Sequence, residues 1–293
     1  MELKTGMICV GCEPDESQGR RYPFGAVVWA GCKRGHSAPP APGSTCRILW
    51  ALGKTEGENG FVAGYQRVKD QGGVSLRLGI LGGTFDPIHY GHLRLAEETA
   101  EALGLEKIIL LPAALPPHKD RKPITTFFHR LQMTRIAAQA SPLLEVQDLE
   151  GRREGLSYSI ETLREFHRQF SPGLELFFVL GMDAFLEVRT WKEYDRLFDY
   201  AHFVVIKRPG VPSESLESFL SSLGLGFRKE DHGDDFVAPS GFRLIYREAT
   251  LLDISSTAIR RKVADGRSIR FLVPEGVLMY IRQNGLYRTH GDA

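Results

Sequence analysis

The stretch GGTFDPIHYGHL, residues 82–93, places two glycines and two histidines where a strand-like segment gives way to a helix-like one. Gly82 and Gly83 let backbone N–H groups approach an anion, and the helix adds the positive end of its dipole. His89 and His92 share one helix face and could donate hydrogen bonds to a phosphate during a transfer reaction. The spacing matches neither the dehydrogenase G-x-G-x-x-G nor a P-loop. Metal-ligand and purely structural roles are the alternatives, and the strand–turn–helix context favours phosphate.

A second candidate anion site is ISSTAIRRK, residues 254–262. Ser255, which we expect to be the N-cap, is followed by Ser256 and Thr257, so three hydroxyls stand at a helix N-terminus. Arg260, one turn further, adds a fork-shaped cation that suits phosphate. Taken alone, this motif is equally typical of an ordinary helix with a polar N-cap and charged side chains. Two helix-terminus anion sites in one domain are explained together by a triphosphate that spans them.

The third stretch is GMDAF…TWKEY, residues 181–194, which begins directly after an apolar segment. Asp183 is placed there like a partner of a ribose hydroxyl or of a metal ion. Trp191 lies in a polar run, where its indole could stack on an aromatic ring, although a tryptophan is more often part of a core. This stretch therefore predicts contacts with a nucleoside or a ring.

The elements that must position these residues alternate from Leu76 onward. Apolar runs predict strands at 77–81, 107–112, 143–148, 174–181, 202–208 and 242–248. Helical periodicity predicts a helix that ends at Gly104 and others at 127–140, 157–170, 255–266 and 274–285. This alternation predicts an α/β fold: a Rossmann-like doubly wound parallel sheet with helices on both faces and a small helical C-terminal part. Ligands bind such sheets beyond the carboxyl ends of the strands.

Composition sets the outer limits on function. The chain has 293 residues, of which 42% are hydrophobic and 25% charged, as in an ordinary globular protein. A formal net charge of +1 gives no surface for a nucleic acid, so phosphate chemistry must come from local placement of charge. We find no run of about 18 apolar residues and no leader pattern, so we expect no membrane association and a cytoplasmic enzyme.

Residues 1–73 differ from the rest of the chain. They contain stretches such as SAPPAPGSTC and show no sustained hydrophobic period. All four cysteines, Cys9, Cys12, Cys32 and Cys46, lie here, and their spacing lacks the second matched pair of a zinc module. DQGG ahead of Val74 fits a ribosome-binding stretch followed by a valine-type start codon. We therefore expect residues 1–73 to be an atypical extension, disordered or a start-site artefact, and residues 74–293 to be the catalytic domain.

Together, GGTFDPIHYGHLRLAEE, PAALPPHK, REGLSYSIETL, GMDAF, TWKEYDRL, LLDISSTAIRRKV and VLMYIRQNGLY resemble the bacterial nicotinate-nucleotide adenylyltransferases of the nucleotidyltransferase superfamily. The likeness runs from about Arg77 to Tyr287, and residues 1–73 have no counterpart in it. It implies that ATP and nicotinate mononucleotide form deamido-NAD and pyrophosphate, with Mg²⁺ carried by ATP. It also implies direct in-line attack without a covalent intermediate. The residues agree in that no motif pairs a Ser or Cys nucleophile with a base.

The resemblance also implies roles for individual residues. His89, His92 and Arg260 are then the catalytic residues, and His92 is the stronger candidate for stabilising the transition state. The ATP-binding residues would be Gly82, Gly83, Thr84, Phe85, His89, His92, Asp183, Ser255, Ser256, Thr257 and Arg260. The mononucleotide-binding residues would be Thr84, Phe85, His118, Lys119, Tyr158, Ser159 and Trp191. No dedicated metal ligands are implied. Lys192 departs from the aromatic residue that some members carry after the tryptophan.

Other interpretations compete with this one. Phosphopantetheine adenylyltransferases are shorter, usually carry Thr-x-Gly-His in place of HYGH and lack the SYSIETL and TWK segments. An adenylyltransferase that prefers nicotinamide mononucleotide is closer, because only the donors facing the pyridine substituent would differ. A nucleotide-sensing or DNA-associated regulator would use residues 1–73 as an interaction arm, but a near-neutral domain with both phosphate motifs argues against it. The expected assembly is a monomer or a small homo-oligomer.

Overall fold

The computed structural model describes residues 19–21, 27–29, 75–116, 124–170, 172–207, 213–231, 233–250 and 252–288. The chain divides into two compact units, Met1–Val68 and Lys69–Ala293. In the first unit, β1 (Gly19–Arg21) pairs antiparallel with β2 (Val27–Trp29). The four cysteines lie outside the described residues, as does most of the predicted extension 1–73.

The second unit is built on one eight-stranded sheet in the order β5-β4-β3-β6-β7-β10-β9-β8. The first six strands in this order run parallel, and β9 and β8 add an antiparallel edge. By position in the chain, the parallel strands follow the order 3-2-1-4-5-6, which is that of a doubly wound nucleotide-binding sheet. The bounds are β3 (Leu76–Gly83), β4 (Lys107–Pro112), β5 (Leu144–Val146), β6 (Leu174–Gly181), β7 (His202–Ile206), β8 (Arg228–Lys229), β9 (Phe236–Val237) and β10 (Arg243–Arg247).

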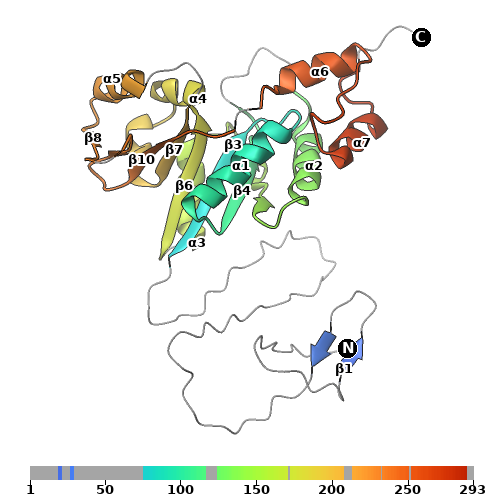
Figure 1. Cartoon of the computed structure of the whole chain (residues 1–293), viewed down its shortest axis with the longest axis horizontal. Helices are drawn as coiled ribbons and strands as arrows, with labels where there is room; N and C mark the ends of the chain where they lie inside the picture. The colour runs from blue at the N-terminus through green and yellow to red at the C-terminus, as the bar shows by residue number, and fades with distance from the viewer. Residues whose placement is uncertain are drawn as a thin grey trace. The chain divides into compact units, whose positions relative to one another are not determined.

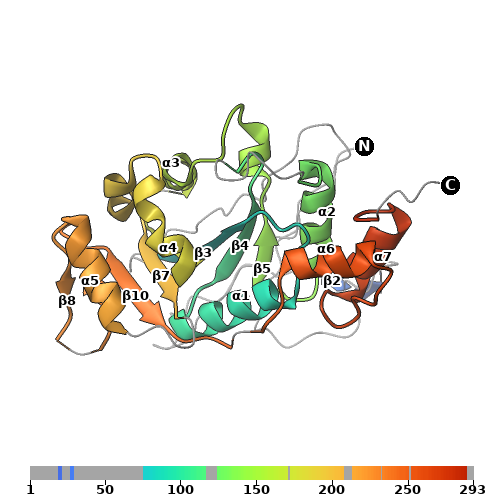
Figure 2. The ribbon, with the colours of Figure 1, turned by 90° about the horizontal axis from the view of Figure 1, so that it is seen from above.

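Helices cover both faces of this sheet. Their bounds are α1 (Tyr90–Leu103), α2 (Phe127–Ala138), α3 (Ser159–Phe170), α4 (Met182–Leu186), α5 (Ser213–Leu223), α6 (Ser256–Ala264) and α7 (Glu275–Gln283). Figures 1 and 2 show α1 and α3 on opposite sides of the strands. Short 3-10 turns occur at η2 (Leu149–Arg152), η3 (Val188–Thr190) and η4 (Tyr194–Asp199). The predicted α/β architecture and its small helical C-terminal part, α6 and α7, are confirmed.

Two buried cores result from the alternation of side chains along each strand. On β4, Ile109 packs with Ile160 of α3 on one face, while Ile108 packs with Ala96 of α1 and Met133 of α2 on the other. Because each parallel strand is buried on both faces, the strands read as continuous apolar runs in the sequence. The winding of the sheet reverses direction at the carboxyl ends of β3 and β6, and sheets of this kind generally bind their ligands at such a point.

The predicted boundaries were close but not all correct. α1 ends at Gly104 as predicted, because this residue takes a left-handed conformation (φ +59°) that closes the helix. Several predicted elements are too long: the strand at 202–208 ends at Ile206, and the helix at 127–140 ends at Ala138. The helix α5 and the short antiparallel strands β8 and β9 were not predicted. Strands of two residues are too short to show a period.

Candidate active site

The turn between β3 and α1 is held in an unusual backbone conformation. Phe85 has a φ of +48°, in the left-handed region that a bulky side chain rarely adopts, and its side chain is buried. A Cβ added to Gly83 would lie 2.8 Å from the Phe85 ring, which explains the glycine. A Cβ added to Gly82 would meet nothing within 4 Å, which leaves its backbone open to an approaching group. Thr84, between these residues, accepts a hydrogen bond through its carbonyl oxygen.

His89 and His92 form one structural unit at the start of α1. His89 is the N-cap residue, and its backbone N–H donates to Nδ1 of His92 over 3.2 Å. The two rings stack with their centroids 3.7 Å apart, and the Phe85 ring meets the His92 ring edge-on at 5.0 Å. A neutral His92 whose Nδ1 accepts a hydrogen bond carries its proton on Nε2. The backbone therefore sets His92 as an N–H donor through Nε2.

His89 is buried and uncharged at neutral pH. Its side chain is only 5% exposed, and burial lowers its pKa from 6.5 to about 4. Its Nδ1 has no hydrogen-bond partner among the described residues. A buried polar atom without a partner is uncommon and costs stability.

The N-terminus of α6 is fastened to the same turn. Ser255 is the N-cap as predicted, since its hydroxyl accepts from the Ala258 N–H over 3.2 Å. Ser256 donates its hydroxyl to the carbonyl of Pro87 over 2.9 Å. Arg260 donates to the carbonyl of Asp86 over 2.7 Å and to the hydroxyl of Thr257 over 3.3 Å. The two candidate anion motifs are thus joined directly, although some 170 residues separate them.

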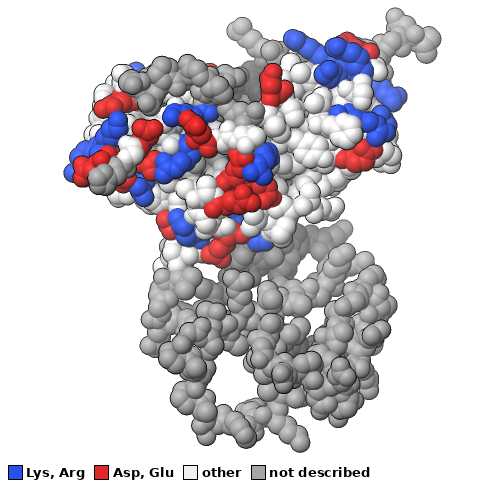
Figure 3. Space-filling view, in the orientation of Figure 1, with Lys and Arg blue, Asp and Glu red and all other residues white. Residues whose placement is uncertain are grey.

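This junction brings two positively polarised helix N-termini to one edge of the sheet, which favours an anion. Figure 2 shows α6 beside α1, and the hydrogen bond from Ser256 to the β3–α1 turn agrees with that view. Figure 3 shows Lys and Arg side chains gathered over α6 and α7. The N-termini of α1 and α6 add partial positive charge from their unpaired backbone N–H groups. This arrangement of charge therefore favours an anionic ligand at the candidate site.

The residues of the third stretch follow β6, at the next carboxyl end along the sheet. Asp183 is exposed in the first turn of α4. Trp191 is half-buried and meets Phe178 edge-on at 6.2 Å, so it contacts the core and keeps part of its indole exposed. Both of the alternatives considered for Trp191 are compatible with this placement.

Tyr158 and Ser159 lie at the start of α3 and are partly exposed. The amino group of Lys192 lies 4.6 Å from the centre of the Tyr158 ring and 2.5 Å from the Glu161 carboxylate. The Glu161 hydrogen bond raises the pKa of Lys192. Lys192 thus brings a cation next to the residues predicted to hold the pyridine ring. His118 and Lys119 lie outside the described residues.

Three residues of the site were missed by the sequence analysis. Asp86, Arg130 and Tyr287 surround the base of the β3–α1 turn, and Asp86 and Arg130 are buried. Asp86 lies within GGTFDPIHYGHL, but its spacing from the neighbouring residues did not indicate a role for its side chain. The one available signal for Arg130 was its place among apolar residues in FFHRLQM, where a buried face was expected.

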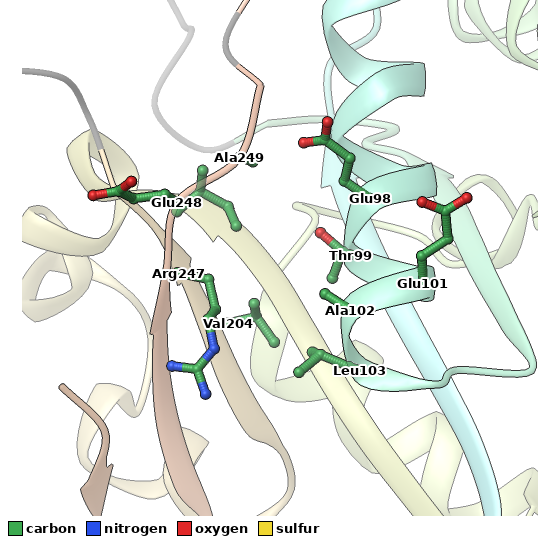
Figure 4. Close-up of a pocket in the computed structure, with 10 residues that line it drawn as sticks. Glu98, Thr99, Glu101, Ala102, Leu103, Val204, Arg247, Glu248 and Ala249 are labelled. Carbon is green, nitrogen blue, oxygen red and sulfur yellow. The ribbon is translucent and has the colours of Figure 1, made fainter. Parts of the chain in front are cut away.

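A cavity of about 440 Å³ lies elsewhere, between α1 and the ends of β7 and β10 (Figure 4). Its walls include Glu98, Leu103, Val204 and Arg247, and none of the predicted binding residues lines it. Glu98 there accepts from the Thr250 N–H over 2.6 Å, which ties the segment after β10 to α1. We therefore do not assign substrate binding to this cavity.

Among the described residues, no group of three or more His, Cys, Asp or Glu side chains is arranged to hold a metal ion. No helix there has both the length and the apolar character needed to cross a bilayer.

Comparison with known proteins places this geometry in context. Residues 80–262 match the family model described as cytidylyltransferase-like. The chain is 45% identical over 218 residues to a probable nicotinate-nucleotide adenylyltransferase of Desulfatibacillum aliphaticivorans, covering 72% of this chain and all of the relative. It is 44% identical over 216 residues to a protein of the same name from Geobacter metallireducens, covering 73% of this chain and 99% of that relative.

Solved structures show the same fold. The chain is similar to Plasmodium falciparum nicotinic acid mononucleotide adenylyltransferase complexed with NaAD, with a TM-score of 0.56 and 21% identity. That likeness covers 72% of this chain and 97% of the other. A second structure of the same protein, complexed with APC, gives a TM-score of 0.53 over 72% of this chain and 96% of that one.

Proposed function

The chain belongs to the cytidylyltransferase-like family and, within it, to the nicotinate-nucleotide adenylyltransferases of NAD biosynthesis, and from this premise we propose how its residues act. The reaction joins ATP and nicotinate mononucleotide to give nicotinate adenine dinucleotide and pyrophosphate. The observation that carries the site assignment is the junction of α6 with the β3–α1 turn through Ser256 and Arg260. It joins the two segments proposed to bind phosphate, which supports a site for a triphosphate.

The proposed mechanism is a direct in-line displacement. A phosphate oxygen of the mononucleotide attacks the α-phosphorus of ATP and forms the new P–O bond. The bond from that phosphorus to the bridging oxygen of the β-phosphate breaks, and pyrophosphate leaves with the electron pair. No covalent enzyme intermediate is needed, so catalysis consists of positioning and of stabilising charge that moves toward the leaving group.

We assign His92 and Arg260 to stabilising the negative charge that moves toward the leaving pyrophosphate. The backbone N–H of His89 fixes His92 as an Nε2 donor, which suits a hydrogen bond to a phosphate oxygen that gains charge in the transition state. The Ser255, Ser256 and Thr257 segment opens α6 toward the β- and γ-phosphates. Gly82, Gly83, Thr84 and Phe85 would supply backbone contacts, and Asp183 would lie near the adenosine.

We propose that Mg²⁺ enters bound to the triphosphate. The ion would take its ligands from the phosphates of ATP and from water, as Mg²⁺ commonly does. When bound, the ion neutralises part of the phosphate charge. The N-termini of α1 and α6 would bind and orient the phosphates.

The pyridine ring is assigned to Tyr158, Ser159 and Trp191, and the mononucleotide phosphate is assigned to His118 and Lys119. Donors aimed at both oxygens of the pyridine carboxylate would favour nicotinate over nicotinamide. An amide NH₂ in place of one oxygen leaves a donor unpaired, at a cost of about 1–3 kcal/mol, or roughly 5- to 150-fold in discrimination.

The test of this function is release of pyrophosphate from ATP and Mg²⁺ with three alternative acceptors. We expect rapid release with nicotinate mononucleotide, slower release with nicotinamide mononucleotide and none with phosphopantetheine. The matched control is the His92→Ala variant purified in the same way, which accounts for contaminating host enzyme. Release with none of the acceptors would overturn the proposed function, and a preference for nicotinamide mononucleotide would change the substrate.

We further propose that residues 74–293 form the catalytic domain, since all assigned residues lie there. A chain that begins at Val74 should turn over with the same kcat and KM as the full chain. A loss of activity in the shorter chain would give residues 1–73 a role in catalysis. For the assembly and the compartment we propose a monomer or small homo-oligomer in the cytoplasm, which light scattering and cell fractionation would test.

A further inference from the structure

The side chain of Asp86 is the centre of a buried polar cluster beneath the β3–α1 turn. It is 4% exposed, and its Oδ1 accepts from the Tyr287 hydroxyl over 2.7 Å. Its Oδ2 accepts from the Thr125 N–H over 3.3 Å and lies 3.9 Å from the Arg260 guanidinium. A buried carboxylate needs such partners, because leaving one of its oxygens unpaired is costly.

Arg130 of α2 extends this cluster to the neighbouring loops. Its side chain is 1% exposed, and it donates to four backbone carbonyls, those of Thr84, Ala113, Ala114 and Thr125, over 2.6 to 3.0 Å. Burial lowers the pKa of Arg130, and the nearby Asp86 opposes that shift. The guanidinium stays charged. One buried cation therefore ties together the segments after β3 and β4 and the segment that precedes α2.

Tyr287 closes the cluster from the C-terminal end of the described chain, 201 positions after Asp86. Its φ is +64°, so the backbone is held in the left-handed region at this aromatic residue. Burial and the adjacent Asp86 raise the pKa of the Tyr287 phenol, so the hydroxyl remains a donor at all working pH values. Phe85, next to Asp86, is held in the same region of φ. Strained residues thus stand on both sides of this hydrogen bond.

We infer that Tyr287 is a positioning residue for adenylyl transfer, acting through Asp86 on the β3–α1 turn. This inference rests on the proposed function. The Tyr287 hydroxyl holds the Asp86 carboxylate, and the backbone carbonyl of Asp86 receives the Arg260 hydrogen bond that aligns α6. His89 follows only three positions later, at the start of α1. Loss of the hydroxyl would remove none of the groups proposed to touch the substrates. It would loosen the β3–α1 turn that aligns those groups.

The chain offers a matched control in Tyr280 of α7. Its hydroxyl lies 2.9 Å from Nδ1 of His129 on α2, so it too links the C-terminal part of the chain to the helix that carries Arg130. Like Tyr287, it is half-buried. Its partner His129 packs against Phe128 and Tyr280, so the Tyr280→Phe variant removes a comparable hydrogen bond without touching Asp86.

The experiment compares Tyr287→Phe with Tyr280→Phe in two measurements. The first is amide hydrogen exchange over residues 84–92 in the substrate-free protein, where we expect exchange at least about fivefold faster in Tyr287→Phe and unchanged in Tyr280→Phe. The second is steady-state turnover. We expect kcat to fall about tenfold in Tyr287→Phe, which is less than the roughly hundredfold loss that a 1 Å misplacement of reacting groups causes. The KM values for both substrates should stay within about twofold of the wild type.

Equal exchange in the two variants would overturn the inference, and so would faster exchange in Tyr287→Phe without a fall in kcat relative to Tyr280→Phe. A fall in unfolding midpoint with unchanged kcat would also assign Tyr287 to stability alone. If the wild-type protein released no pyrophosphate with any acceptor, the proposed function would fail, while the exchange measurement would still decide whether Tyr287 anchors the turn.

Discussion

Ser256, at the first turn of α6, donates its hydroxyl to the backbone carbonyl of Pro87 over 2.9 Å, and so fastens a late helix to a turn 169 positions earlier. Arg260 makes a second bond to this turn, at Asp86. Neither motif can therefore shift without the other. A site that must hold a triphosphate during a displacement gains from this rigidity, because the phosphates are aligned before the reaction begins.

Replacing His92 with Ala should lower kcat by about 10²-fold or more, the scale of losing one preorganised transition-state donor. The physical reason is its orientation: the His89 N–H holds Nδ1, so Nε2 is the atom that can donate. Steady-state kinetics with ATP varied would test this. An intact kcat with a raised KM for ATP would instead make His92 a residue that binds the ground and transition states equally.

Replacing Arg260 with Ala should lower kcat/KM for ATP by about 10²-fold, because it removes a phosphate donor and the bond that joins α6 to the turn. The control is Arg261→Ala, which removes the same charge from the next position, where the side chain is exposed. We expect the control to stay within about twofold of the wild type. Equal losses in the two variants would show that only the net charge of α6 matters.

Replacing Trp191 with Ala should raise the KM for the mononucleotide about tenfold and change kcat little, if the indole stacks on the pyridine ring. Because Trp191 also contacts Phe178, the unfolding midpoint should fall as well. Trp191→Phe keeps an aromatic face and should recover most of the binding. A KM that is unchanged in the Ala variant, beside a lowered midpoint, would assign Trp191 to the core.

The alternation of strands and helices was predictable because a parallel strand buried on both faces leaves an unbroken apolar run. The edge strands β8 and β9 were not predictable, since strands of two residues are too short to show a period. The two candidate anion motifs stand out in the sequence because their glycines, hydroxyls and Ser255 cap follow local rules, and of these the Ser255 cap is confirmed. Their direct contact through Ser256 and Pro87 needed the folded chain.

Arg130 shows the limit of such prediction most clearly. A charged residue in an amphipathic helix is normally exposed, and nothing nearby in the sequence indicates a partner. Its acceptors are backbone carbonyls, which every residue has, so no residue type marks them. Tyr287 is similar, because its partner Asp86 lies 201 positions away. Residues that position a site through the backbone are therefore harder to find than those that contact substrate.

The buried His89 should make the protein sensitive to mild acid. Its pKa is about 4 in the folded protein against 6.5 as the ordinary value, so the unfolded chain binds more protons between these pH values. Stability contributed by the neutral ring is therefore present above pH 6.5 and is lost as the pH falls toward 4. From pH 7 to pH 5 this one group should cost about 2 kcal/mol of unfolding free energy.

Denaturant unfolding of the wild type and of His89→Gln at pH 7 and pH 5 measures this contribution. The Gln variant cannot take up the proton, so its decline in stability over this range should be smaller by about 2 kcal/mol. His202→Gln is the comparison, because burial lowers the pKa of His202 too while the neighbouring Glu175 opposes that shift. We expect His202→Gln to change the pH dependence of the unfolding free energy less than His89→Gln does. Identical slopes in the wild type and His89→Gln would mean that water or a proton reaches the His89 ring freely, which its 5% exposure argues against.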